Sequence, residues 1–411
     1  MDWFKRQGLL AEIIDDQHMA VVCSGDLQLR NGDAHFPFRV NSDFYYLTGI
    51  DEPNACLLIR RKQGLIERSL IILNPPLNRR IWDSYWVLTP QSEELSSYDN
   101  VFTWADQDQL NKFLTDCAAL TVYHEGLSAH ALTLFASLKT NSGPLRRFLS
   151  NMRLKKSNEE IKIIEQACQI SSAVYKELYH VEKKYWTNEA IIEGFWINEG
   201  KKRGALNQAY QPIIAGGERA CCLHYNKNNR SLSGDSYVLI DAGFEVEYYA
   251  SDITRVLFLK QPTQLVSELY ALLLTIQMQA IEDVAPGISF YQLQERVQRS
   301  MAEGLKYLGV FKGSIDKILE QDVPRCYMHG LGHHLGLDVH DASGLSLKTA
   351  MLEEDMVITV EPGFYFGPAS FPDHPLRGTG FRIEDDVLVT AQGRRVLTSA
   401  PKQLRDILNG C

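Results

Sequence analysis

The stretch of this chain best suited to chemistry is a histidine run from Met328 to Asp341, MHGLGHHLGLDVHD. His329, His333 and His340 are spaced four and seven residues apart among glycines and leucines. Histidine is the commonest metal ligand and a frequent general acid or base, and glycine lets backbone or substrate approach closely. The alternative is a loop that is merely rich in histidine, and acidic partners elsewhere in the chain decide between the two.

Four carboxylates stand inside or at the ends of apolar, strand-like segments in the second half of the chain. They are Asp241 in VLIDAG, Asp252 in YASDITR, Glu361 in ITVEPG and Glu384 in FRIEDD. A carboxylate in a buried strand is costly unless it is paired, protonated or bound to a metal. Like charges ~4–5 Å apart repel by roughly 1–4 kcal/mol per pair. One such residue is best explained by a salt bridge, but four beside a histidine run predict a site for two divalent cations.

The predicted ligands are mostly oxygen atoms, which narrows the choice of metal. Four carboxylates and one imidazole suit Mn²⁺ best, with Co²⁺ or Zn²⁺ as alternatives, and do not suit an ion that selects thiolates. Side chains alternate along a strand, so Arg382, Glu384 and Asp386 share one face while Asp385 points the other way. Glu384 is therefore the predicted ligand with Arg382 beside it, and Asp385 is predicted to lie outside the site.

The elements that position these residues divide into two predicted domains, 1–150 and 151–411. In the first, short helices alternate with apolar strands such as His18–Cys23 and a strand-like segment at Phe44–Leu47, which predicts a three-layer α/β domain. The aromatic stretch RRIWDSYWV contains Trp82 and Trp86 and is predicted to be an interface.

The second domain is predicted to begin with a long helix. Ser157 and Glu160 have the spacing of a capping box, S-x-x-E, which opens a helix that runs to about Tyr179. Ser289 and Gln292 form a second capping box at the start of another long helix. The carboxylate-bearing strands lie on both sides of this helical region in the sequence.

Composition narrows the classes of function. The chain has 411 residues and a formal net charge of -9, which argues against nucleic acid or an anionic membrane as partner. No uncharged apolar stretch is long enough to span a bilayer, so a cytoplasmic protein is expected. Scattered cysteines without C-x-x-C spacing are expected to be reduced and structural. They are Cys23, Cys56, Cys117, Cys168, Cys221, Cys222, Cys326 and Cys411.

The five candidate ligands, in chain order and in their surrounding sequences, resemble those of the pita-bread metallopeptidases. They are Asp241 in IDAG, Asp252 in SDITR, His333 in HGLGHHLG, Glu361 in TVEPG and Glu384 in RIEDD. LHYN around His224 and the N-terminal RNGDAHFPFRVNSDFYYLTGIDEPNA are similar to the Xaa-Pro aminopeptidase (aminopeptidase P) branch. The resemblance implies a creatinase-like α/β domain over 1–150 followed by a pita-bread catalytic domain over 151–411.

The resemblance also implies a role for each ligand. Asp241 would chelate one metal, and His333 and Glu361 the other. Asp252 and Glu384 would bridge the pair. A water or hydroxide held between the metals would be the nucleophile, because two cations lower its pKa, and Glu361 would shuttle its proton.

Five further positions would handle the substrate. His224 and His340 would hydrogen-bond to the scissile carbonyl or the tetrahedral intermediate, and His329 would line the proline side. Such donors are worth a few kcal/mol each when they face developing charge. Arg382 and Tyr365 would position the substrate or support the groups that do.

The activity implied is hydrolysis of the bond between any N-terminal residue and a following proline, by a homo-oligomer that is a dimer or tetramer. The closest alternative is a prolidase restricted to X-Pro dipeptides. The intact set of ligands argues against two others, a non-catalytic binding module of this fold and a metal-free amidinohydrolase. The chain departs from the family at Gly332 and His334, where serine and tryptophan are frequent. A short loop carrying Lys348 is a further departure.

Overall fold

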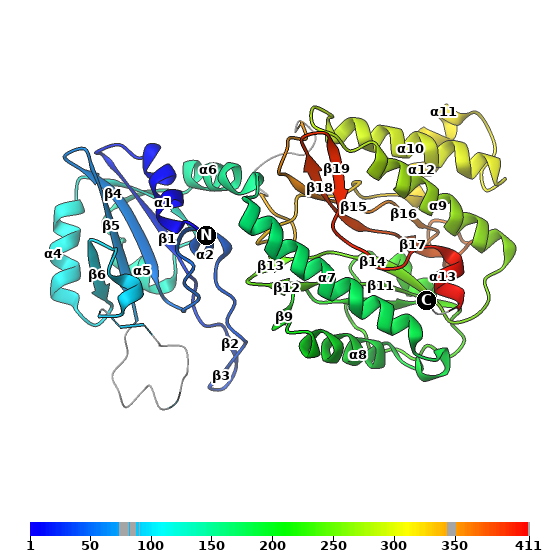
Figure 1. The fold of residues 1–411 in the computed structure, drawn as a ribbon, viewed down its shortest axis with the longest axis horizontal. Coiled ribbons are helices and arrows are strands. Elements are labelled where there is room, and N and C mark those ends of the chain that lie inside the picture. Colours follow the sequence, from blue (N-terminus) through cyan, green and yellow to red (C-terminus); the bar gives the residue numbers. More distant parts are fainter. Residues whose placement is uncertain (74–81, 83–87, 90, 343–350, 410–411) are drawn as a thin grey trace. The chain divides into compact units, whose positions relative to one another are not determined.

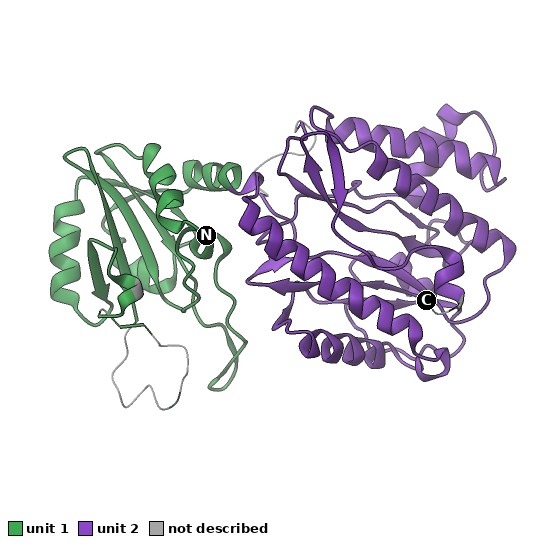
Figure 2. Ribbon diagram, viewed as in Figure 1, with its two compact units in different colours: residues 1–152 green, residues 153–411 purple. Residues whose placement is uncertain are grey.

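The computed structural model describes residues 1–411 apart from 74–81, 83–87, 90, 343–350 and 410–411 (Figure 1). The described chain divides into two compact units, Met1–Met152 and Arg153–Cys411 (Figure 2). Trp86 and Lys348, which the sequence singles out, lie outside the described residues. Among the helices that are described, none is both long and apolar enough to cross a membrane.

A six-stranded mixed sheet with the order β6-β5-β4-β1-β7-β8 forms the centre of the first unit. Strand β1 is antiparallel to β4 and parallel to β7. The elements up to the unit boundary are α1 (Trp3–Glu12), β1 (His18–Cys23), β2 (Leu29–Asn31), β3 (Ala34–His35), α2 (Ser42–Thr48), β4 (Cys56–Lys62), β5 (Leu65–Ile72), η1 (Glu93–Leu95), β6 (Asn100–Thr103), α4 (Gln107–Cys117), β7 (Thr121–Glu125), α5 (Ala129–Leu134), β8 (Lys139–Asn141) and α6 (Gly143–Leu154).

Alternation along the strands gives this sheet two apolar faces. Val21 and Cys23 of β1 belong to a buried cluster with Trp104 and with Phe113 of α4. Figure 1 shows α4 and α1 on opposite sides of the sheet. The unit is therefore built of three layers, helix, sheet and helix.

The strand predicted at Phe44–Leu47 is wrong, because this segment is part of helix α2. The side chain of Asn41 accepts hydrogen bonds from the backbone N–H groups of Asp43 and Phe44, so it caps the helix. Gly49 ends the helix in the left-handed conformation, with φ 68°. The aromatic residues favour a strand by propensity, and the cap and the terminating glycine override that preference.

Strands of several small sheets form the interior of the second unit. Figure 1 shows them between α7 and α8 on one side and α9 and α10 on the other. The elements are α7 (Asn158–His180), η2 (Lys183–Tyr185), α8 (Glu189–Lys202), β9 (Asn207–Gln208), β10 (Ile213–Gly216), η3 (Gly217–Cys221), β11 (Tyr237–Asp241), β12 (Phe244–Val246), β13 (Tyr249–Ala250), β14 (Thr254–Phe258), α9 (Gln264–Glu282), α10 (Phe290–Tyr307), α11 (Ile315–Lys317), η4 (Ile318–Asp322), α12 (Val323–Cys326), β15 (Val357–Val360), β16 (Gly363–Tyr365), β17 (Gly380–Arg382), β18 (Asp385–Thr390), β19 (Gly393–Val396) and α13 (Leu404–Asn409).

Helix α7 packs against the strands that carry the carboxylates. The capping box of Ser157 and Glu160 is present at its start, as the sequence predicts. Farther along, the hydroxyl of Tyr175 lies 3.0 Å from the carbonyl oxygen of Ile240 and 2.7 Å from that of Ile253. These contacts join the helix to the backbone beside Asp241 and Asp252.

Candidate metal centre and active site

The predicted ligands converge on one pocket of about 330 Å³ in the second unit. His224, His329, His340 and Arg382 lie on its walls as well. The lining residues are Leu223, His224, Asp241, Asp252, His329, Gly330, Gly332, His333, His340, Glu361, Arg382 and Glu384. Of the site residues that the sequence predicts, only Tyr365 is not in this lining, and it reaches the pocket through hydrogen bonds.

Strand register brings the carboxylates together. Asp241 ends β11 and pairs with Thr254, the first residue of the antiparallel β14, so Asp252 just before β14 lies close to it. The backbone at Gly243 lies against the backbone at Ser251, since a Cβ atom on Gly243 would lie 1.8 Å from the carbonyl oxygen of Ser251. Glu361 directly follows β15, and Glu384 lies between β17 and β18.

Asp252, His333 and Glu384 form the most compact group, because each offers a ligand atom within 4.8 Å of the others'. The Nε2 atom of His333 is 3.5 Å from Oδ2 of Asp252 and 3.5 Å from Oε1 of Glu361. On its other side, Nδ1 lies 3.1 Å from the carbonyl oxygen of His334, to which it donates. That hydrogen bond directs Nε2 at the carboxylates, so its lone pair becomes available to a metal ion when Nε2 loses its proton.

Tyr210 is a site residue that the sequence analysis missed. Its hydroxyl lies 2.6 Å from Oδ1 of Asp241 and 2.5 Å from Oδ1 of Asp252, while Arg382 donates to the other oxygen of Asp241. A tyrosine in an apolar segment is an ordinary core residue, so nothing in its type or spacing distinguishes it.

Thr254 was missed for the same reason. Its hydroxyl donates to Oε2 of Glu384 at 2.6 Å and accepts from Nε of Arg382 at 2.9 Å. Nη1 of Arg382 also donates to the hydroxyl of Tyr365 at 2.9 Å. That hydroxyl lies 2.9 Å from Nε2 of His329, whose Nδ1 donates to the Gly330 carbonyl oxygen at 2.8 Å. The chain of contacts fixes the His329 ring, so Arg382 supports both a carboxylate and an imidazole.

Burial and mutual repulsion raise the pKa values of three of the four carboxylates. Burial would also raise the pKa of Asp252, but its hydrogen bonds with His333 and Tyr210 lower it. Burial raises the pKa of Asp241, raises that of Glu361 to about 7, and raises that of Glu384 well above its usual range. Burial alone would lower the pKa of His333, but the Asp252 hydrogen bond and the charges of Glu361 and Asp252 raise it to about 9. Four carboxylates facing two cationic side chains carry excess negative charge. The donor set therefore fits divalent cations, which would balance that charge.

Two of the remaining imidazoles of the pocket, His329 and His340, have lowered pKa values. Burial lowers the pKa of His329 to about 4 and also lowers that of His340. The ring of His340 stacks on His333 with centroids 4.0 Å apart. His224 follows η3 in an exposed turn that forms part of the pocket wall. A neutral imidazole retains one N–H that it can donate to a substrate oxygen.

Several acidic and basic groups near the histidine run belong to the framework. Asp341 pairs with Lys156 at 3.0 Å, and Arg153 binds both Asp341 and Asp338. His334 is buried, and among the described residues neither of its ring nitrogens has a hydrogen-bond partner. Gly332 is required by close packing, since a Cβ atom there would lie 2.0 Å from the carbonyl oxygen of Thr359.

An oxygen-rich ligand set in a buried pocket, next to histidines that can donate to a substrate oxygen, is the site of a metal-dependent hydrolase. Two family models match the chain: aminopeptidase P, N-terminal domain, over residues 4–123, and metallopeptidase family M24 over residues 162–391. The chain belongs to metallopeptidase family M24. These matches confirm the predicted fold class, a creatinase-like α/β domain followed by a pita-bread domain.

Individual relatives agree with the family assignment. The chain is 38% identical to a Xaa-Pro aminopeptidase of Haemophilus influenzae, over 92% of this chain and 90% of that protein. Its structure is similar to that of E. coli aminopeptidase P with the inhibitor Pro-Leu, with a TM-score of 0.91, 30% identity, and coverage of 100% of this chain and 97% of the other. Proline aminopeptidase P II from Yersinia pestis gives a TM-score of 0.89 and 33% identity, with coverage of 100% and 98%.

Proposed function

We propose that this protein is a metalloaminopeptidase that hydrolyses the bond between any N-terminal residue and a following proline. The observation that carries the proposal is the convergence of Asp241, Asp252, His333, Glu361 and Glu384 on one pocket. Its relatives of similar length are named Xaa-Pro aminopeptidases, which supports the same activity here.

We further propose two divalent cations, Mn²⁺ in preference to Co²⁺ or Zn²⁺. Asp241 would bind one ion, His333 and Glu361 the other, and Asp252 and Glu384 both. When bound, such ions lower the pKa of a water molecule and polarise a carbonyl group. The contacts of Tyr210, Thr254 and Arg382 would hold the carboxylates in place and so fix the geometry of the ligands.

Glu361 is proposed as the group that moves the proton. Its carboxylate lies at the pocket wall, and burial raises its pKa to about 7, so it can both accept and release a proton near neutral pH. The oxygen of water adds to the scissile carbonyl carbon, and Glu361 takes the proton that this oxygen loses. The carbon–nitrogen bond then breaks as the proton passes to the proline nitrogen, which leaves as an amine.

The other histidines of the pocket would bind the substrate. We propose that His340 and His224 donate N–H groups to the carbonyl oxygen as negative charge develops on it. His329, held by Tyr365 and the Gly330 carbonyl, would form the wall against the pyrrolidine ring. Proline has a fixed φ and no backbone N–H, so a rigid wall suits it better than a strand-like binding groove.

Two further predictions concern the whole molecule. We propose a homo-oligomer, a dimer or tetramer, that works in the cytoplasm on peptides with proline in the second position. Trp82 is 78% exposed, which supports a contact between copies at that surface. Light scattering of the wild type and of Trp82→Ser would measure the assembly, and a monomer at micromolar concentration would contradict it.

The activity is tested with purified protein that has been treated with a chelator and then given one divalent metal at a time. We expect release of the first residue from X-Pro-Y-Z peptides with Mn²⁺, and none from matched X-Ala-Y-Z peptides. A prolidase would cleave only the X-Pro dipeptide. No release with any divalent metal would overturn the proposed activity, and metal analysis of the same samples would count the bound ions.

A further inference from the structure

Two cysteines of the first unit face each other across neighbouring strands. Cys23 ends β1, Cys56 begins β4, and the antiparallel register pairs them directly. Both side chains are buried in the apolar cluster that contains Trp104. Neither takes part in the catalytic pocket, so the proposed function leaves this pair without a role.

The backbone geometry at this pair is the one that permits a disulfide. The N–H of Ser24 donates to the carbonyl oxygen of Ala55 at 2.8 Å, directly beyond the pair. Cys23 and Cys56 therefore occupy a non-hydrogen-bonded position, where Cα atoms lie about 4.5 Å apart. Disulfides span Cα separations of about 4.4–6.8 Å, so the strands need no rearrangement.

The sulfur atoms are already close together. The two Sγ atoms lie 2.7 Å apart. A disulfide bond is about 2.05 Å long, so bond formation requires an approach of less than ~1 Å. Rotation about the two Cα–Cβ bonds supplies such a movement without a change in the sheet.

We propose that Cys23 and Cys56 are a redox pair that forms a reversible disulfide across β1 and β4. The inference is independent of the catalytic pocket and of the peptidase activity. Both cysteines are free in this structure, and the proposal gives them a role beyond that of the reduced packing groups that the sequence predicts.

The oxidant we infer is a low-molecular-weight disulfide, RSSR. The hydrogen bond from Cys56 lowers the pKa of the Cys23 thiol, while burial raises the pKa of Cys56 well above its usual range. Cys23 is therefore the attacking thiolate. It bonds to one sulfur of RSSR and releases RS⁻. Cys56 then loses its proton and attacks the Cys23 sulfur, releasing the second RS⁻. The two cysteines lose two electrons and two protons, and RSSR becomes two RSH.

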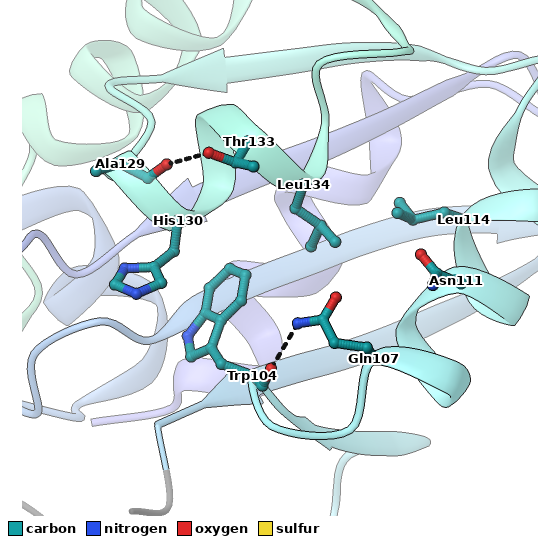
Figure 3. Close-up of a pocket in the computed structure, with 8 residues that line it drawn as sticks. All are labelled: Trp104, Gln107, Asn111, Leu114, Ala129, His130, Thr133 and Leu134. Atoms are coloured by element: carbon teal, nitrogen blue, oxygen red, sulfur yellow. Dashed lines mark hydrogen bonds between the residues drawn. The ribbon is translucent and has the colours of Figure 1, made fainter.

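A pocket of about 450 Å³ lies beside the start of α5 (Figure 3). Ser128 hydrogen-bonds to both thiols and caps α5. The next two residues of the chain, Ala129 and His130, line the pocket. Figure 3 shows the indole of Trp104 on the opposite wall. Opening of the start of α5 would therefore bring a small oxidant from the pocket to Cys23.

Cys117 supplies a matched control within the same apolar cluster. It is buried like the pair, but its sulfur lies 2.9 Å from Nη1 of Arg60, which donates to it. Cys222 is exposed and should form a mixed disulfide with any added disulfide, without a partner cysteine. It therefore reports that the oxidant is active.

The test uses the full-length wild-type protein in oxidised glutathione with about 1 M urea, below the unfolding transition, until Cys222 has reacted completely. Remaining thiols are alkylated in acid-quenched samples, and peptides are mapped by mass spectrometry without reduction. We expect one linked peptide pair containing Cys23 and Cys56, which dithiothreitol separates. Because wild-type protein carries this readout, it does not depend on whether a variant folds.

A second readout is the thermal midpoint of the first unit. Oxidation should raise it by roughly 5–10 °C in the wild type and in Cys117→Ser, because the bond closes a loop of about thirty residues. It should leave the midpoint of Cys23→Ser and Cys56→Ser unchanged. The proposal is overturned if both thiols of the wild type remain open to alkylation, or if the linked peptides contain another cysteine.

Discussion

Glu384 and Asp385 are neighbours in the chain, both are buried, and they lie in opposite electrostatic surroundings. Asp385 accepts hydrogen bonds from Arg255 and Lys402, each at 2.6 Å, and its pKa is held well below its usual range although burial opposes this. Glu384 lies in the pocket beside other carboxylates, and burial raises its pKa well above its usual range. Burial therefore does not distinguish Asp385 from Glu384, which we propose as a metal ligand. The charges that face these two acids do.

The same difference in facing charges divides the other acids near the site into two sets. Asp341, like Asp385, is neutralised by cationic side chains, which are Arg153 and Lys156. We call these two acids the closed set, and Asp241, Asp252, Glu361 and Glu384 the open set. The closed set is complete within the protein. The open set has four carboxylates facing two cationic side chains, Arg382 and His333, and a divalent cation can supply the missing positive charge.

The largest expected effect is that of Glu384→Ala. Removal of a carboxylate proposed to bind both ions should abolish detectable turnover, a fall of at least roughly 10³-fold, which corresponds to about 4 kcal/mol in the barrier. Metal analysis should show loss of bound ions from the same sample. The exposed Glu354 provides a control, since Glu354→Ala should keep full activity and metal. Normal metal content in Glu384→Ala would contradict its place in the open set.

Asp385→Ala should affect stability instead. The change leaves Arg255 buried without its carboxylate, and breaking a buried ion pair in this way costs about 3–5 kcal/mol. Urea unfolding of the chelated protein measures that loss. The exposed Asp373 serves as control, because Asp373→Ala should stay within about 0.5 kcal/mol of the wild type.

Metal content distinguishes the two sets in the same Asp385→Ala protein. At a temperature where it remains folded, we expect it to bind divalent ions in wild-type amount. Loss of the ions with unchanged stability would place Asp385 in the open set and remove the distinction.

The open set was predictable from the sequence because its members break an apolar pattern. A carboxylate in ITVEPG or VLIDAG is costly in a buried strand unless something compensates it, so Glu361 and Asp241 are conspicuous. Each alone is best explained by a salt bridge, and the prediction depends on all four carboxylates together with the histidine run. Site residues of types that are common in a core cannot be identified in this way. Tyr210 and Thr254 contact the open set through hydroxyl groups, yet their types are ordinary in apolar segments.

Pairing between strands limits prediction in the first unit. That Cys23 faces Cys56 depends on the register of β1 against β4, and a shift of one residue would place them on opposite faces. Single-sequence patterns do not fix that register. The helix α2 was missed for a related reason, since the cap at Asn41 outweighs the strand propensity of the aromatic residues that follow it.

The pH dependence of stability should have opposite signs for Asp385 of the closed set and for Glu361 and His333 of the pocket. The folded pKa of Asp385 is below its ordinary value of 3.8, so its contribution is present above that pH and is lost as the pH falls. Glu361 and His333 have raised pKa values of about 7 and about 9, against ordinary values of 4.5 and 6.5. Their protons stabilise the metal-free fold below those ordinary values, and this stability is lost as the pH rises through about 7 and about 9.

Thermal melting of chelated protein from about pH 3 to about pH 10 measures both losses of stability, the acid arm below neutral pH and the alkaline arm above it. We expect the midpoint to fall by several degrees toward acid and toward alkali. Added Mn²⁺ should remove the alkaline fall, because metal takes the place of the protons, and should leave the acid fall caused by Asp385. An alkaline arm that is insensitive to metal would show that the open set does not bind it.

The smallest expected effect is that of Tyr210→Phe, which removes only the hydroxyl shared by Asp241 and Asp252. Loss of an outer hydrogen bond to ligands typically lowers metal affinity by about 10–100-fold, so titration against a competing chelator should show weaker binding with the number of ions unchanged. Tyr175→Phe is a matched control, because within the described part of the chain the hydrogen bonds of that hydroxyl go to the backbone carbonyls of Ile240 and Ile253. It should reduce stability and leave metal affinity as it was. Equal effects of the two changes on metal affinity would mean that strand position, and not the Tyr210 hydroxyl, orients the carboxylates.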